Sequence, residues 1–349
     1  MGDKEKKTEL SELGEFGLIS HLTGDIKIKH KETMKGVGDD AAILDYRNKL
    51  VVATSDILME GIHFNLVYSP LKHLGYKAVT VNLSDIFAMN GYPMQVIISI
   101  AISSKFSLEQ IDELYDGIKL ACEKYGVDIA GGDTTTSLTG MAISITALGE
   151  ISKEEIVYRN GARENDIICV SGDLGASYLG LQILEREKKL FLDDPGIRPG
   201  LEGYEYVLER QLKPEARKEV IDVLREKKVL PTAMIDISDG LSSEINHICS
   251  QSEKGCKLFA GHIPFHKETE EVGEELKIEP LTAALDGGED YELLFTVSQE
   301  DFEKLQDVPF IKPIGHITAK GSGLNLVTPD GSIIQLSSKG WNPLGKNPG

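Results

Sequence analysis

Apolar and polar positions alternate along this chain in segments of two kinds. Short apolar runs predict buried strands at Leu50–Thr54, Gln95–Ser103 and Met141–Leu148. Longer segments, with apolar residues three or four positions apart, predict helices at Leu71–Met89 and Ser107–Tyr125. The second helix begins with a serine, a residue type suited to accept a hydrogen bond from an amide of the first helical turn.

The same alternation resumes after the polar segment 152–165. A chain of 349 residues exceeds the roughly 100–200 residues of one domain. We therefore predict two domains, residues 1–155 and 156–349, in an α/β or α+β fold with two lobes. In the second lobe the pattern predicts strands at 167–170, 233–237 and 291–297, and helices at 176–187, 214–226 and 241–250.

Charge and cysteine content narrow the class of protein. The chain carries 37 basic and 56 acidic residues, a net charge of −19, which argues against nucleic-acid binding and against docking on anionic membranes. No apolar run approaches the roughly 18 residues of a membrane span. The four cysteines form no C-x-x-C pair, and the N-terminal segment is charged, so we expect reduced thiols in a cytoplasmic protein.

Acidic residues stand at unusual places in the first lobe. Adjacent carboxylates at Asp39 and Asp40 repel each other, which suits either an exposed turn or a cation. Thr54, Ser55 and Asp56 stand at the end of a predicted strand, where ligands bind in open α/β sheets. Their hydroxyl and carboxylate oxygens suit a hard cation, and a helix or turn cap is the alternative.

Asp85 lies on an apolar helix face. Leu74, Ala78, Val81 and Asp85 follow one another at intervals of four, three and four residues, so they share one side of the helix. A buried carboxylate is costly unless it is paired or bound to metal. Asp85 therefore predicts a cation site, and a solvated helix end is the alternative.

Three further aspartates complete this set. Asp133 follows two glycines in Gly131–Thr135, where backbone amides can approach an anion closely. Asp236 interrupts an apolar strand and has no comfortable structural role without a cation. Asp239 stands where the next helix starts, so an ordinary N-cap is its alternative.

Gathered in one cleft, these carboxylates would repel both one another and a phosphate ligand. Several Mg²⁺ ions would reverse that repulsion by bridging acids to phosphate oxygens. Mg²⁺ suits the set better than Zn²⁺, because the candidate ligands are oxygens and no cluster of histidines and cysteines is visible.

Six motifs resemble those of the thiamine-monophosphate kinases and run in that family's order from about residue 12 to 341. They are Gly38-Asp39-Asp40-Ala41-Ala42, Ser55-Asp56 with Glu60-Gly61-Ile62-His63-Phe64, Asn82-Leu83-Ser84-Asp85-Ile86 with Ala88-Met89, Gly131-Gly132-Asp133-Thr134-Thr135, Ile235-Asp236-Ile237-Ser238-Asp239-Gly240-Leu241, and Gly287-Gly288-Glu289-Asp290-Tyr291-Glu292-Leu293.

The resemblance implies a fold, substrates and site residues. The fold is that of aminoimidazole ribonucleotide synthetase. Its N-terminal lobe binds ATP and Mg²⁺ and forms a homodimer through its sheet, and its C-terminal lobe completes the active site. The substrates are ATP and thiamine monophosphate. The implied metal ligands are Asp40, Thr54, Ser55, Asp56, Asp85, Asp133, Asp236 and Asp239. The implied nucleotide contacts are Gly132, Asp133, Arg159 and Ser238, and the implied catalytic residues are Asp133, Arg159 and Asp236.

His63, Glu289 and Trp341 match positions that touch the thiamine phosphate. Each has a plainer alternative: a packed or solvated histidine, a solvated glycine-rich turn, and packing of the single tryptophan against its lobe. An indole face near the cationic thiazolium would make a cation–π contact. The sequence departs from the family at Thr54-Ser55-Asp56-Ile57, where relatives often read Ser-Thr-Asp-Thr, and at Asn90, which interrupts the usual Met-Gly.

These residues lead to a hypothesis of direct in-line transfer of the γ-phosphoryl group from ATP to thiamine monophosphate. Two rivals remain. Another enzyme of the same fold, such as selenophosphate synthetase, would be expected to carry a reactive cysteine near the N-terminus, whereas the first cysteine here is Cys122. A non-catalytic nucleotide-binding module would share the acids without needing His63, Glu289 and Trp341.

Overall fold

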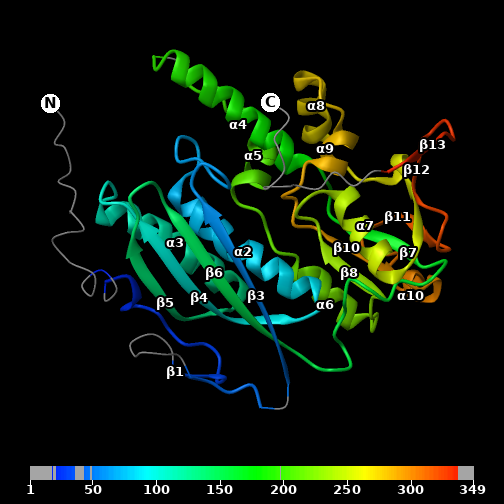
Figure 1. Ribbon diagram of the computed structural model, residues 1–349, viewed down its shortest axis with the longest axis horizontal. Helices are drawn as coiled ribbons and strands as arrows, with labels where there is room; N and C mark the ends of the chain where they lie inside the picture. Colours follow the sequence, from blue (N-terminus) through cyan, green and yellow to red (C-terminus); the bar gives the residue numbers. More distant parts are fainter. Residues whose placement is uncertain (1–17, 19–20, 36–42, 48, 197, 337–349) are drawn as a thin grey trace. The chain divides into compact units, whose positions relative to one another are not determined.

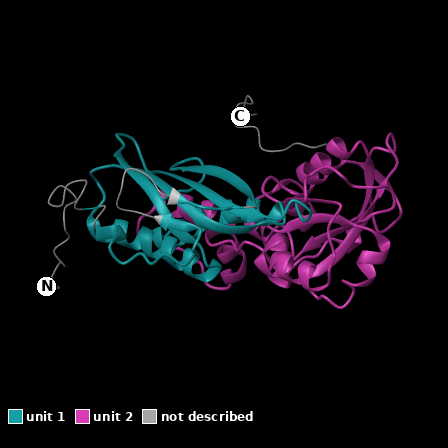
Figure 2. Ribbon diagram, turned by 90° about the horizontal axis from the view of Figure 1, so that it is seen from below, with its two compact units in different colours: residues 1–156 teal, residues 157–349 magenta. Residues whose placement is uncertain are grey.

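The structure, a computed structural model, describes residues 18, 21–35, 43–47, 49–196 and 198–336. The chain divides into two compact units, residues 1–156 and 157–349 (Figure 2). The predicted domain boundary at 155/156 lies beside this division, and the roles assigned to the two domains stay predictions.

A four-stranded sheet forms the centre of the first unit (Figure 1). Its strand order is β3-β6-β4-β5, with bounds β3 Leu50–Met59, β6 Ala142–Ile151, β4 Tyr92–Ile102 and β5 Asp128–Thr136. The strands pair antiparallel except β4 and β5, which run parallel. Two short strands, β1 Thr33–Lys35 and β2 Ile43–Leu44, form a separate pair.

Two long helices, α2 Leu71–Ala88 and α3 Leu108–Tyr125, pack against each other, and α2 lies on the sheet. Glycines let the two helices come into backbone contact. A Cβ at Gly75 would lie 2.0 Å from the carbonyl oxygen of Leu114, and one at Gly117 would lie 1.8 Å from that of Lys72. Any side chain at either position would therefore force the helices apart.

The other face of this sheet is open along β3 and the adjoining part of β6, whereas Thr33 and Tyr46 cover Gln95 on β4. Along β6, Ile143 and Ile145 are buried, whereas the intervening Ser144 and Thr146 are half-buried, because successive side chains point to opposite faces. On β3, Ile57 and Met59 are 53% and 40% exposed. One face thus carries the helices, and the other presents hydroxyl and aliphatic side chains.

The second unit is built on a seven-stranded sheet of order β13-β12-β9-β11-β7-β10-β8. All pairs are antiparallel except β12 with β9. The strands are β7 Ile167–Ser171, β8 Ala233–Asp236, β9 Gly255–Phe259, β10 Leu293–Val297, β11 Ile311–Thr318, β12 Leu324–Val327 and β13 Ile333–Gln335.

Helices surround this second sheet (Figure 1). A core of aliphatic side chains fills the space between the sheet and α7, with Ile168, Ile235, Ile245 and Leu258 almost fully buried. The helices are α4 Ala176–Asp193, α5 Glu205–Leu212, α6 Lys218–Glu226, α7 Leu241–Ser252, α8 Lys267–Leu276, α9 Pro280–Asp286 and α10 Gln299–Glu303, with a short 3₁₀ turn η1 at Ala260–His262.

The predicted α/β class is confirmed, but the structure differs from the predicted elements at three places. The strand predicted at Leu50–Thr54 continues to Met59, because it pairs with β6 along its whole length. Gly131–Thr135, which was not predicted as part of a strand, lies inside β5, next to a bulge. The helix predicted from residue 214 begins at Lys218.

Among the residues that the structure describes, no helix is both long and apolar enough to cross a membrane.

Candidate functional site

Oxygen atoms from β3 and α2 meet in the first unit. The Thr54 hydroxyl donates a hydrogen bond of 2.6 Å to Oδ2 of Asp85, and the backbone N–H of Asp56 donates one of 3.0 Å to Oδ1 of Asn82. Asn82 and Asp85 are three residues apart, so one helix face presents both to the strand. Thr54 and Asp56 are two apart, so they share the face of β3 that meets this helix.

The two carboxylates in this cluster carry like charges and repel each other. Burial, and then the negative charge of Asp85, raise the pKa of Asp56 to about 6. Two carboxylates and a threonine hydroxyl are hard oxygen donors of the kind that Mg²⁺ binds in proteins. A cation beside Asp56 and Asp85 would relieve their repulsion, so these residues fit the metal that the family resemblance implies.

Ser55 lies on the opposite face of β3. Its hydroxyl accepts a 3.0 Å hydrogen bond from Thr146 on β6, at the open face of the sheet. Strand alternation therefore turns Ser55 away from Asp85, and its role as a metal ligand stays a prediction.

Gly132 and Asp133 lie on β5, the edge strand opposite β3, with β6 and β4 between. A Cβ at Gly132 would lie 2.1 Å from the carbonyl oxygen of Ile98, so only glycine fits there. Asp133 is exposed beside it. The sheet itself does not place Asp133 against Thr54 and Asp85, and its metal and catalytic roles stay predictions.

His63 belongs to a tight turn after β3. Its Nδ1 accepts a 3.0 Å hydrogen bond from the backbone N–H of Met59. In the same turn, the Glu60 carboxylate accepts a 2.7 Å bond from the N–H of Met141. Glu60 therefore has a structural role. The ring of His63 is exposed, and its contact with substrate stays a prediction.

In the second unit, two of the predicted motifs lie side by side. The N–H of Glu289 donates to the carbonyl of Ser238 at 2.7 Å, and that of Tyr291 donates to Ile237 at 2.8 Å. The loop reaches this position through left-handed backbone at Gly288, whose Cβ would lie 2.5 Å from the Ser238 oxygen. Asp236, at the end of β8, is 3% exposed.

A group of acids surrounds the start of α7. Gly240, not Asp239, is the N-cap, and the N–H of Asp239 donates to Oε1 of Glu244 at 3.1 Å. Burial raises the pKa of Asp239, which Glu289 also raises and His247 lowers. Burial likewise raises the pKa of Glu244 to about 7, although its interactions with the Asp239 amide and Arg159 lower it.

Glu244 and Asn82 are two candidate site residues that were not predicted from the sequence. Both are polar side chains at almost fully buried positions. Asn82 precedes Asp85 by one helical turn, and Glu244 lies in the first turn of the helix after Asp239. This helical spacing from a predicted ligand was a usable signal for both.

A buried ion network supports the loop that carries Glu289. Glu292 is fully buried, and its Oε1 pairs with Nη2 of Arg210 at 2.9 Å and with Arg217. The Ser171 hydroxyl donates to Oε2 of Glu292 at 2.5 Å. Gly172 leaves room for this carboxylate, since its Cβ would lie 2.3 Å from Oε1.

Asp290 is buried next to this network. Its Oδ2 accepts a 2.8 Å hydrogen bond from the N–H of Gly175, the N-cap of α4. Burial raises the pKa of Asp290 to about 7 against the opposing charge of Arg210.

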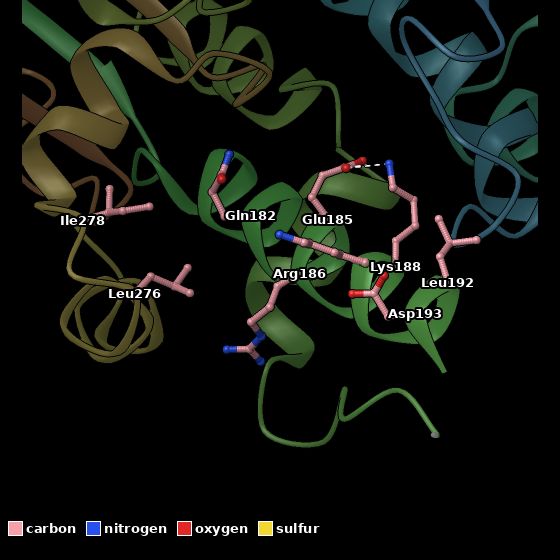
Figure 3. A pocket seen from close by; sticks show the side chains of 9 residues that line it. Gln182, Glu185, Arg186, Lys188, Leu192, Asp193, Leu276 and Ile278 are labelled. Carbon is pink, nitrogen blue, oxygen red and sulfur yellow. Dashed lines mark ion pairs between the residues drawn. The ribbon is translucent and has the colours of Figure 1, made fainter. Parts of the chain in front are cut away.

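Two predicted site residues, Asp40 and Trp341, lie outside the described residues. Within the described part of the chain, no three His, Cys, Asp or Glu side chains are grouped as a metal site. A cavity of about 640 Å³ lies along α4, near the end of α8 (Figure 3). No predicted site residue lines it; its lining includes Gln182, Glu185, Arg186, Lys188, Leu192, Leu276 and Ile278.

Comparison with known proteins places this geometry in a family. Residues 38–151 match the family model described as AIR synthase related protein, N-terminal domain. The thiamine-monophosphate kinase of Bacillus subtilis (strain 168) is 32% identical over 338 residues, covering 95% of this chain and 99% of that protein. That of Aquifex aeolicus (strain VF5) is 35% identical over 333 residues, covering 95% and 98%.

A solved structure, "AaThiL complexed with AMPPCP and TMP", superposes on this chain with a TM-score of 0.72. The two are 33% identical, and the superposition covers 96% of this chain and 98% of that one. The predicted aminoimidazole ribonucleotide synthetase-like fold is thereby confirmed. With relatives above 30% identity along nearly their whole length, the chain belongs to the thiamine-monophosphate kinase family.

Proposed function

We propose that this chain transfers the γ-phosphoryl group of ATP to the phosphate of thiamine monophosphate, which yields thiamine diphosphate and completes its biosynthesis. The observation that carries the proposal is the near full-length match to thiamine-monophosphate kinases at 32% and 35% identity. A related structure, 33% identical, holds AMPPCP, an ATP analogue, together with TMP.

Mg²⁺ is the proposed cofactor. In the first unit the oxygens of Thr54, Asp56 and Asp85 would hold it, and in the second unit Asp236 and Asp239 are the proposed ligands. Bound there, the metal would neutralise phosphate charge and orient the triphosphate. Support comes from the surroundings of Asp56, where burial and then the like charge of Asp85 raise its pKa to about 6.

The chain's own residues position the two substrates in this proposal. Gly132 and Ser238 contact the nucleotide, while Asp133, Arg159 and Asp236 are the catalytic set. His63, Glu289 and Trp341 hold the thiamine phosphate. No strong general base is required, because the acceptor phosphate is largely ionised near neutral pH, with a second pKa of about 6. Rate enhancement then comes from in-line alignment and charge neutralisation.

The open face of the first unit's sheet is the proposed surface of a homodimer. It presents exposed aliphatic side chains, among them Val51, Ile57 and Met59. Burial of such side chains favours association. Sedimentation of the full chain should give twice the monomer mass of 38.2 kDa, and Ile57→Glu should lower that mass. The proposed compartment is the cytoplasm, where ATP is abundant.

The decisive experiment measures ADP release with and without thiamine monophosphate, together with the mass of the product. We expect ADP only when thiamine monophosphate is present, one thiamine diphosphate per ADP, and loss of both on chelation with recovery on adding Mg²⁺. ATP consumption with aminoimidazole ribonucleotide precursors or selenide instead, without thiamine diphosphate as product, would favour another enzyme of this fold. Nucleotide binding without any turnover would favour a non-catalytic module.

A further inference from the structure

Glu289 is held at its backbone and at its side chain by different parts of the second unit. Its N–H is fixed on Ser238, as described above, and its Oε2 accepts a 2.8 Å hydrogen bond from Nε2 of Gln211 on α5. Gln211 is 5% exposed. The carboxylate that the proposed function assigns to substrate binding is therefore oriented by a buried amide.

The amide of Gln211 is itself held in one orientation. Its Oε1 accepts a 2.6 Å hydrogen bond from the hydroxyl of Ser177, a fully buried residue in the first turn of α4. A carboxylate can only accept, so the NH₂ group of Gln211 must face Glu289 and its oxygen must face Ser177. The three side chains form a directed chain from Ser177 through Gln211 to Glu289.

Close packing of α4 against α5 holds these hydrogen-bonded side chains in place. A Cβ at Gly180 would lie 2.0 Å from the carbonyl oxygen of Val207 and 3.2 Å from Cβ of Gln211, so α4 and α5 are in backbone contact. The residue next to Gln211, Arg210, is anchored by its 2.9 Å ion pair with buried Glu292. Gln211 thus projects from a backbone that has little room to shift.

From this geometry we infer that Gln211 is a positioning residue that sets affinity for thiamine monophosphate by orienting the carboxylate of Glu289, with Ser177 fixing the direction of its amide. The inference rests on the proposed function, because it needs Glu289 to touch that substrate. Gln211 acts only through Glu289, so the ATP site and the phosphoryl transfer itself are not its targets.

The test substitutes Gln211→Met, which keeps an unbranched side chain of similar length and removes the hydrogen bonds to Glu289 and Ser177. KM for thiamine monophosphate should rise about tenfold, as expected for loss of a hydrogen bond to a charged group. The turnover number and KM for ATP should change little, and the melting temperature should fall modestly because the buried Ser177 hydroxyl loses its acceptor. Ser177→Ala should shift KM in the same direction by less, and Gln211→His, which retains a ring N–H donor, should restore part of the affinity.

A matched control and a double variant make the result specific. Gln182→Met makes the same change on α4, at the cavity of Figure 3, and should leave all constants unchanged. In a Glu289→Ala background, Gln211→Met should have no further effect on KM. Additive effects, or a fall in turnover and melting temperature with unchanged KM, would overturn the inference.

Failure of the proposed function gives a different result. In that case the wild-type chain itself shows no turnover of thiamine monophosphate. If wild type turns over but Glu289→Ala leaves KM unchanged, the proposed function stands and the positioning role of Gln211 is refuted.

Discussion

Acidic side chains shielded from solvent have opposite surroundings in the two units. In the first unit Asp56 is placed near Asp85, and burial together with that like charge raises the pKa of Asp56 to about 6. In the second unit Glu292 is buried more deeply, yet two arginines and a serine hydroxyl surround it. The first arrangement suits a cation from solution, whereas the second is neutralised within the chain and has a structural role.

The largest expected effect is on stability and falls in the second unit. Glu292→Gln removes the buried counter-charge of Arg217 and leaves Arg210 only the more distant Asp290, 3.9 Å away, and loss of a buried partner costs about 3–5 kcal/mol. Urea denaturation of the wild type and the variant measures the difference. Asp307→Asn, which breaks a surface pair with Lys227, is the control and should show no measurable change. Equal effects of the two variants would contradict the structural role of Glu292.

In the first unit the same kind of substitution should reduce activity and leave stability intact. Asp85→Asn removes a proposed metal ligand, so kcat/KM should fall about 100-fold. The melting temperature without metal should stay the same or rise, because the charge opposing Asp56 is gone.

Asp112→Asn, on the surface of α3 where it pairs with His21, is the control for Asp85→Asn and should keep full activity. A fall in the melting temperature of Asp85→Asn that matches its loss of activity would show that Asp85 has a structural role instead.

The smallest effect concerns the pH dependence of stability. Burial raises the pKa of Asp290 from 3.8 to about 7 in the folded state. Its favourable contribution is therefore fully present below pH 3.8 and is lost as the pH rises through about 7. Asp290→Asn cannot titrate, so its free energy of unfolding should fall less between pH 4 and 7 than that of the wild type. Parallel curves for the two proteins would contradict the raised pKa.

Local patterns predicted the parts of the site that depend on one segment. Helical spacing placed Asp85 on a buried face, and α2 does present it to Thr54. The strand predicted at Leu50–Thr54 was too short. The apolar run Ile57–Met59 indicated that the strand continues, and in a continuous strand Ser55 points to the face opposite Thr54. Sequence motifs placed Ser238 and Glu289 in one site, and their loops do contact each other.

The pairing of distant segments could not be predicted from the sequence. Arg217 and Glu292 are 75 residues apart, and no local period relates them. Their contact depends on the order of strands around β7 and β10 and on a glycine at position 172 that leaves space for a carboxylate. Gln211 was missed for the same reason, because its meaning comes from Ser177 and Glu289 on other elements.

The glycine contacts between α2 and α3 have a consequence for how the first unit can move. With backbone touching backbone at Gly75 and Gly117, neither helix can slide past the other by a turn. The two helices therefore move together as one rigid pair, and Asp85 lies ten residues, roughly 15 Å, along α2 from Gly75. A methyl group added at Gly75 or Gly117 would tilt α2 relative to α3 and separate Asp85 from Thr54 without touching either residue.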